Sequence, residues 1–224
     1  MFQDKQKQYQ KDELRKEIHL DGTVADTLAN LTHYVNRTTA AFGLSSLSKE
    51  KIRCYVGNGA KKLFERVLND VGGMDQFDEI FAHFNTLYNQ NPYHALSTFE
   101  GMPETLAALK AKGIRLAVLS NKPHYATLPI CHHLFDDMMD CVQGQTDGIP
   151  VKPDPTGLQL VLKTLQVSPE DCVYVGDSDV DMLTGKQGGM LTVGVSWGFR
   201  EEEELRQSGA DVLIHHPQEL LQLL

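Results

Sequence analysis

Four short segments of this chain carry most of the residues that could take part in chemistry. They read His19-Leu20-Asp21-Gly22-Thr23, Ser120-Asn121-Lys122-Pro123, Lys152-Pro153-Asp154-Pro155, and Gly176-Asp177-Ser178 followed by Asp181. Gathered in one place, the carboxylates could hold a hard cation through oxygen, and a lysine could neutralise an anionic group. Each segment also has an ordinary interpretation, because Asp-Gly is a common turn pair and acidic residues are favoured at a helix start. Their chemistry therefore depends on whether the fold brings them together.

The elements around these segments alternate between helix and strand from about residue 103 onward. Helices are expected at 103–112, 154–166, 180–187, 200–207 and from 217, and strands at 114–119, 172–175, 190–195 and 211–214. This alternation predicts an α/β fold, a Rossmann-like parallel sheet with helices on both faces. Ligands of such sheets bind beyond the carboxyl ends of the strands. Each of the four segments follows or lies near an expected strand, so we expect their side chains to converge.

Residues 25–92 differ from the rest of the chain. Their apolar residues recur at helical spacing, and no strand-like alternation interrupts them. The glycines of Gly57-Asn58-Gly59 and Gly72-Gly73 break the pattern into separate helices. We therefore expect an inserted all-helical cap at 25–92. The α/β core is then formed by 19–24 and 93–224, after an atypical N-terminal segment at 1–18.

Composition narrows the classes of partner. The 224 residues carry a formal net charge of −9, which argues against nucleic acid or an anionic membrane as a partner. A small phosphorylated metabolite remains possible, because a metal ion and a few cationic side chains can meet its charge locally. The four cysteines are scattered and no apolar run is long enough to span a bilayer. We expect a cytoplasmic protein with free thiols, either a monomer or a homodimer.

Taken together, the four segments resemble the catalytic motifs of the haloacid dehalogenase-like hydrolases, most closely the phosphoglycolate phosphatases and their relatives. The resemblance covers nearly the whole chain from Leu20 on, including the run Gly194-Val195-Ser196-Trp197-Gly198-Phe199-Arg200. It implies a Rossmann-like core with a helical cap and an enzyme that hydrolyses phosphomonoesters. In that family the phosphoryl group passes first to an aspartate and then to water, with Mg²⁺ as cofactor. The substrate that the resemblance implies is a small phosphorylated metabolite such as 2-phosphoglycolate.

The resemblance also implies which residues would hold the metal. Asp21 would be the general acid and later the general base, and its backbone carbonyl would help to bind Mg²⁺. Asp177 would be a direct Mg²⁺ ligand, and Asp181 a second acidic group that orders the metal and its waters. Carboxylates, a carbonyl, water and phosphate supply the octahedral oxygen ligands that Mg²⁺ requires.

A second set of implied roles concerns the substrate. Ser120 and the backbone amide of Asn121 would bind phosphoryl oxygens, and Lys152 would neutralise the nucleophile together with the phosphoryl charge. Arg200 lies near the expected active face and could contact either the substrate or the cap. These residues complete the catalytic and substrate-binding set that the motifs imply.

The chain departs from the family at the nucleophile. The first motif normally begins with an aspartate, and His19 stands in that place. A histidine can in principle accept a phosphoryl group on nitrogen, but imidazole cannot offer Mg²⁺ the oxygen ligand that a bridging carboxylate gives. We favour an inert replacement and expect very slow hydrolysis or none. The alternative function is a non-catalytic descendant that binds a phosphate ligand or regulates another protein.

The residues before the first motif are also unusual. Residues 12–18 read Asp-Glu-Leu-Arg-Lys-Glu-Ile, whereas the central strand of such a sheet is nearly all apolar. This composition suits a solvated helix better than a buried strand. A disturbed N-terminal sequence would explain both this stretch and His19, whereas an evolved loss of catalysis would explain His19 alone.

Overall fold

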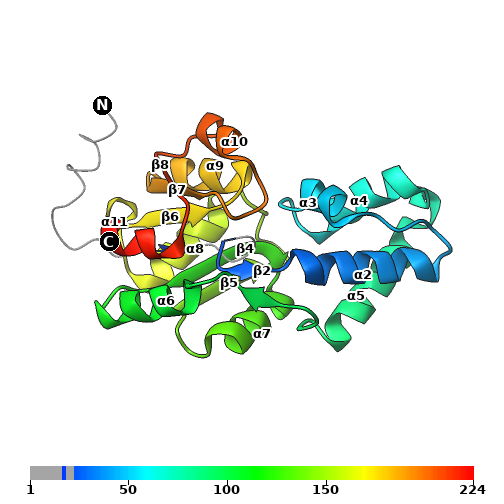
Figure 1. Ribbon diagram of the computed structural model, residues 1–224, viewed down its shortest axis with the longest axis horizontal. Helices are drawn as coiled ribbons and strands as arrows, with labels where there is room; N and C mark the ends of the chain where they lie inside the picture. The colour runs from blue at the N-terminus through cyan, green and yellow to red at the C-terminus, as the bar shows by residue number, and fades with distance from the viewer. Residues whose placement is uncertain (1–16, 19–22) are drawn as a thin grey trace.

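The structure is a computed structural model that describes residues 17–18 and 23–224. A sheet flanked by helices lies beside a separate lobe of helices, α2–α5 (Figure 1). The strands are β1 (Glu17–Ile18), β2 (Ala25–Asp26), β3 (Ser97–Thr98), β4 (Ala117–Pro123), β5 (Cys141–Gln145), β6 (Val173–Gly176), β7 (Leu191–Val195) and β8 (Val212–Ile214). The α-helices are α2 (Leu28–Ala41), α3 (Lys49–Tyr55), α4 (Ala60–Val71), α5 (Phe77–Gln90), α6 (Met102–Ala111), α7 (His124–Phe135), α8 (Thr156–Leu165), α9 (Asp179–Gln187), α10 (Glu202–Gln207) and α11 (Leu220–Leu223). Within these described ranges, every helix is too short or too polar to cross a membrane.

All pairings in the main sheet are parallel. Its strand order is β1-β6-β7-β8, and β4 and β5 form a second parallel pair. Strand β1 also lies close to β4, so the β4–β5 pair continues the sheet on the β1 side. The carboxyl ends of these strands therefore face the same way, as the predicted α/β fold requires.

Alternate residues of each buried strand point to opposite faces of the sheet. On β4, Val118 joins the apolar cluster under α6, α7 and α11, whereas Ala117 and Leu119 join the cluster under α8. On β6, Val175 joins the first of these clusters and Tyr174 joins the cluster under α8. Both faces are thus covered by helices, which explains why these strands read as continuous apolar runs rather than as alternating ones.

The helical lobe has an apolar core of its own. Helices α2, α4 and α5 contribute buried residues at helical spacing, among them Leu31, Phe64 and Phe84, and α3 contributes Ile52. The short antiparallel ribbon of β2 and β3 stands where the chain enters and leaves this lobe. We call α2–α5 the cap. Two residues of the sheet domain, Ala126 on α7 and Phe199 after β7, are packed into the cap cluster and join the two parts.

The expectation of a solvated helix before the first motif was wrong for the two residues described there. Glu17 and Ile18 pair in parallel with Tyr174 and Val175 of β6 and form strand β1. Residues 12–16 lie outside the described residues. Backbone pairing with β6 overrides the polar composition, because strand preference depends more on neighbours than on the residue itself.

The strand that carries the second motif was predicted a few residues too early. A strand was expected at 114–119, but β4 begins at Ala117 and ends at Pro123, with a shift of register between Leu119 and Pro123. Ser120, Asn121 and Lys122 are buried within the last part of the strand rather than beyond it. The strand was predicted to end with the apolar run, at residue 119. No pattern in the sequence indicates that the polar side chains after it are buried as well.

Helix α9 is held to the sheet through a glycine. A Cβ on Gly185 would lie 2.4 Å from Cγ2 of Thr192 and 2.8 Å from Cβ of Tyr174. Gly185→Ala should therefore lower the free energy of unfolding by about 1–3 kcal/mol through overpacking, although alanine favours a helix by up to ~1 kcal/mol over glycine. Urea denaturation measures this. Leu183→Ala, at an exposed site of the same helix, is the control and should change stability by no more than about 0.5 kcal/mol. A fully stable Gly185→Ala protein would contradict this packing.

Candidate active site

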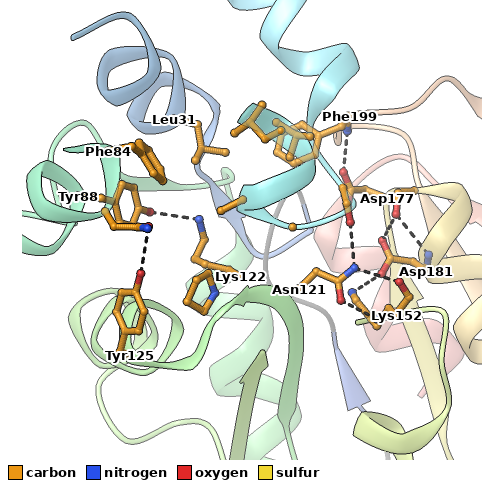
Figure 2. A pocket seen from close by; sticks show the side chains of 18 residues that line it. Leu31, Phe84, Tyr88, Asn121, Lys122, Tyr125, Lys152, Asp177, Asp181 and Phe199 are labelled. Carbon is orange, nitrogen blue, oxygen red and sulfur yellow. Dashed lines mark hydrogen bonds and ion pairs between the residues drawn. The ribbon is translucent and has the colours of Figure 1, made fainter. Parts of the chain in front are cut away.

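A cavity lies between the cap and the carboxyl end of the sheet. Its volume is about 60 Å³, room for a few water-sized groups. It is lined on the sheet side by Asn121, Lys122, Pro123, Tyr125, Lys152, Asp177, Ser178, Asp181 and Phe199, and on the cap side by Leu31, Val56, Gly57, Gly59, Ala60, Leu63, Phe84, Asn85 and Tyr88. Figure 2 shows these side chains around one space. Segments from three of the four motifs therefore meet here.

Asp177 follows the last residue of β6 and is almost completely buried. The backbone N–H of Phe199 donates to its Oδ2 at 2.7 Å, and the hydroxyl of Thr23 donates to Oδ1 at the longer distance of 3.4 Å. Trp197 Nε1 donates to the carbonyl of Thr23 at 2.9 Å, which ties the first motif to the loop after β7. A rigidly held, buried carboxylate of this kind suits a metal ligand.

Lys152 and Asp181 form a buried ion pair. The Nζ of Lys152 lies 2.7 Å from Oδ1 of Asp181 and donates to the carbonyl of Leu119 at 3.2 Å. The hydroxyl of Ser178, the N-cap of α9, donates to Oδ2 of Asp181 at 2.6 Å. Both carboxylate oxygens of Asp181 are thus engaged by protein groups, so in this structure Asp181 positions Lys152.

Asn121 connects three parts of the site. Its Oδ1 accepts the backbone N–H of Lys152 at 2.7 Å, and its Nδ2 donates to the carbonyl of Gly57 in the cap at 3.1 Å. Ser120 is buried beside it, where its Oγ accepts the N–H of Lys122 at 3.0 Å. Ser120 does not line the main cavity but borders a smaller one that shares Lys152 and Asn121.

Two glycines make room for the carboxylates. A Cβ on Gly198 would lie 2.1 Å from Cβ of Asp177, and a Cβ on Gly176 would lie 2.2 Å from Cβ of Asp181. Both contacts are far shorter than any that real Cβ atoms make. Glycine at these two positions is therefore a steric requirement of the site.

Comparison with known proteins agrees with this arrangement. Residues 19–195 match the haloacid dehalogenase-like hydrolases as a family. The phosphoglycolate phosphatase of Colwellia psychrerythraea is 34% identical over 197 residues, which cover 85% of this chain and 87% of that protein. The chain belongs to the haloacid dehalogenase-like hydrolase family.

Further relatives extend the match over nearly the full length. The phosphoglycolate phosphatase of Aquifex aeolicus is 31% identical over 207 residues, covering 92% of this chain and 93% of that protein. A crystal structure from Haemophilus somnus, described as a predicted phosphoglycolate phosphatase, superposes with a TM-score of 0.88 at 25% identity and covers 96% of this chain and 99% of that chain. By family, this haloacid dehalogenase-like chain is a phosphatase.

The first motif also supplies two candidate catalytic residues. His19 and Asp21 lie outside the described residues, so their predicted roles stay predictions. Within 17–18 and 23–224, no three His, Cys, Asp or Glu side chains are grouped closely enough to hold a metal ion. Asp177 nevertheless fits a family Mg²⁺ site, because it offers hard carboxylate oxygens to the cavity and its neighbours are hydroxyl and amide groups rather than soft ligands.

Arg200 contacts the cap, the second of the two roles foreseen for it, and is not among the residues that line the cavity. Its guanidinium donates to the carbonyls of Val56, at 2.8 Å, and Arg53, at 3.3 Å, in the cap. In return, Arg53 donates to the carbonyls of Phe199, at 2.8 Å, and Gly198, at 2.9 Å. We call this reciprocal pair the arginine clasp. Because Phe199 also donates its N–H to Asp177, the clasp connects the cap to the carboxylate of the site.

Lys122, Tyr88 and Arg53 were not singled out as functional residues from the sequence. Lys122 belongs to the second motif, but the spacing of the motif residues does not indicate that its ammonium group faces the cavity. Tyr88 and Arg53 belong to cap helices, where apolar periodicity predicts packing and gives no sign of contact with a distant loop. Their roles depend on how the cap packs against the sheet domain. That packing is a property of the tertiary structure and leaves no local pattern in the sequence.

The buried ion pair predicts a specific loss of stability. Lys152→Met leaves Asp181 buried without its counter-charge and should lower the free energy of unfolding by about 3–5 kcal/mol. Adding Asp181→Asn to that variant removes the stranded charge and should restore part of the loss. Chemical denaturation of the two single variants and the double variant measures the coupling. Additive losses would show that the two groups do not stabilise one another.

The arginine clasp predicts a change in local dynamics. Arg53→Met removes both hydrogen bonds to the 198–200 loop and should speed amide hydrogen exchange there by about tenfold, since each bond involves a charged donor. Hydrogen-exchange mass spectrometry measures this. Arg206→Met is the matched control, because Arg206 pairs with Glu202 on its own helix. Unchanged exchange in the loop of the Arg53→Met protein would refute the clasp.

Proposed function

We propose that this chain derives from, and retains the site of, an Mg²⁺-dependent hydrolase of small phosphorylated metabolites, with 2-phosphoglycolate as the first candidate substrate. The family assignment supports hydrolysis of phosphomonoesters. The substrate is suggested by relatives that are named phosphoglycolate phosphatases and are aligned over most of both chains.

The observation that carries the proposal is the convergence of Lys152, Asp177 and Asn121 on one small cavity beneath the cap. These residues come from three segments that are far apart in the chain. The cavity is shared by the sheet and the cap, so a ligand bound there would contact both. A phosphoryl group at its floor would meet a cation and a carboxylate that are both held in place before binding.

Each residue has a chemical task in this proposal. Lys152, held by Asp181, would neutralise phosphoryl oxygens, and the backbone N–H of Asn121 would donate to them. Asp177 would hold Mg²⁺, which when bound supplies charge stabilisation and orients the phosphoryl oxygens. Asp21 would give a proton to the leaving alkoxide and later take one from water. The cap, joined to the loop after β7 by the arginine clasp, would limit the access of bulk water to the cavity when a ligand is bound.

His19 limits what the chain can do as it stands. The family reaction forms a bond between phosphorus and a carboxylate oxygen at this position, and an imidazole offers neither that oxygen nor its reach. Removing the nucleophile from a catalytic unit typically costs several orders of magnitude in turnover. His19 therefore also favours a second candidate function, a binding module that keeps the phosphate pocket without hydrolysis.

Restoring the nucleophile separates these two functions. His19→Asp should raise Mg²⁺-dependent release of phosphate from p-nitrophenyl phosphate and 2-phosphoglycolate by at least about a thousandfold over the unchanged chain. Steady-state phosphate release with and without EDTA measures this. His132→Asp, at an exposed site on α7, is the control and should leave the low rate unchanged.

Two results would contradict this account. Rapid turnover by the chain with His19 in place would show that imidazole serves as nucleophile or that another group does. Tight binding of phosphate without hydrolysis, even after His19→Asp, would identify the binding module as the function.

A further inference from the structure

One wall of the cavity carries a cation to which the motif resemblance gave no role. Lys122 near the end of β4 is 8% exposed and lines the cavity. Its Nζ lies 3.1 Å from the hydroxyl of Tyr88 on cap helix α5 and 5.2 Å from the centre of that ring. A buried ammonium is costly, and the phenol oxygen and aromatic face offset part of that cost. Lys122 is thus held in place by the cap.

The surroundings of Lys122 add a neutral hydrogen-bond donor and positive potential. Tyr125 lines the cavity beside it, and burial, followed by the nearby Tyr88, raises the pKa of the Tyr125 phenol. Tyr125 therefore stays a neutral hydrogen-bond donor at ordinary pH. Helix α7 begins at His124, directly after this strand, so its N-terminal dipole adds positive potential at the same wall.

This wall lies opposite the carboxylates. In Figure 2, Lys122, Tyr88 and Tyr125 stand on one side of the cavity, and Asp177, Asp181 and Lys152 stand on the other. A ligand whose phosphoryl group rests at Lys152 and Asp177 would place its other end toward Lys122.

We propose that Lys122, positioned by Tyr88, binds a carboxylate on the non-transferred end of the substrate. The inference rests on the proposed function and names its substrate class: short phosphorylated carboxylic acids. The lysine would make a charge-assisted hydrogen bond with the carboxylate. Because Tyr88 belongs to the cap, the lysine is correctly held when the cap is closed, so recognition of the acid and closure of the cavity would occur together.

A pair of probes tests the proposal. The probes are 2-phosphoglycolate and 2-hydroxyethyl phosphate, which has a neutral hydroxymethyl group in place of the carboxylate. In the His19→Asp background, Lys122→Met should lower kcat/KM for 2-phosphoglycolate by roughly tenfold to a hundredfold. It should change kcat/KM for 2-hydroxyethyl phosphate by less than about threefold, which also shows that the variant folds.

Further variants define the role of the residue. Lys122→Arg, which keeps the charge, should retain most of the preference for 2-phosphoglycolate, and Tyr88→Phe should lose part of it. Lys163→Met removes a lysine from an exposed site on α8 and should leave both probes unaffected. Calorimetric binding of inorganic phosphate and 2-phosphoglycolate, in Mg²⁺ and with His19 in place, gives the same comparison without turnover.

The outcomes separate the two proposals. Equal losses on both probes, or no loss on either, would overturn the carboxylate assignment alone. If neither probe is hydrolysed and neither phosphate nor 2-phosphoglycolate binds, the proposed function fails and the carboxylate assignment fails with it. A carboxylate preference that disappears in Lys122→Met and persists in Lys122→Arg supports the assignment.

Discussion

The buried ion pair between Lys152 and Asp181 is the interaction on which the rest of the site depends. Through Lys152 it joins the loop after β5 to the first turn of α9, and through the carbonyl of Leu119 it reaches β4. Two charges in this position would be costly if either lacked its partner, so the pair strongly favours one arrangement of three separate segments. The floor of the cavity is therefore in place before any ligand arrives, as electrostatic catalysis requires.

The cap is joined to this floor by groups that also serve the site. The arginine clasp holds the loop that donates an N–H to Asp177, and Phe199 of the same loop is packed into the apolar core of the cap. On the opposite wall, Tyr88 reaches Lys122. Movement of the cap would thus disturb both ends of the cavity at once, which links access for the ligand to the geometry of the charged groups.

Much of the fold and part of the candidate site could be predicted from the sequence. Apolar runs and helical periodicity predicted the α/β core and the helical cap, because burial on two faces and burial on one stripe leave different patterns. The motifs predicted that Lys152 and Asp177 would lie close together. The polar residues before the first motif led to the wrong prediction of a solvated helix. Glu17 and Ile18 form strand β1 because they pair with β6. The roles of Arg53 and Tyr88 could not be predicted either, because they depend on how the cap meets the sheet.

The central claim is that residues of all four motifs surround one phosphoryl-binding cavity beneath the cap. A crystal structure of the chain grown with Mg²⁺ and orthovanadate, an anion of phosphate-like shape, tests it most directly. We expect the metal at Asp177, the anion within hydrogen-bond distance of Lys152 Nζ, and His19 and Asp21 beside them. An anion bound elsewhere, or Asp21 remote from Asp177, would contradict it.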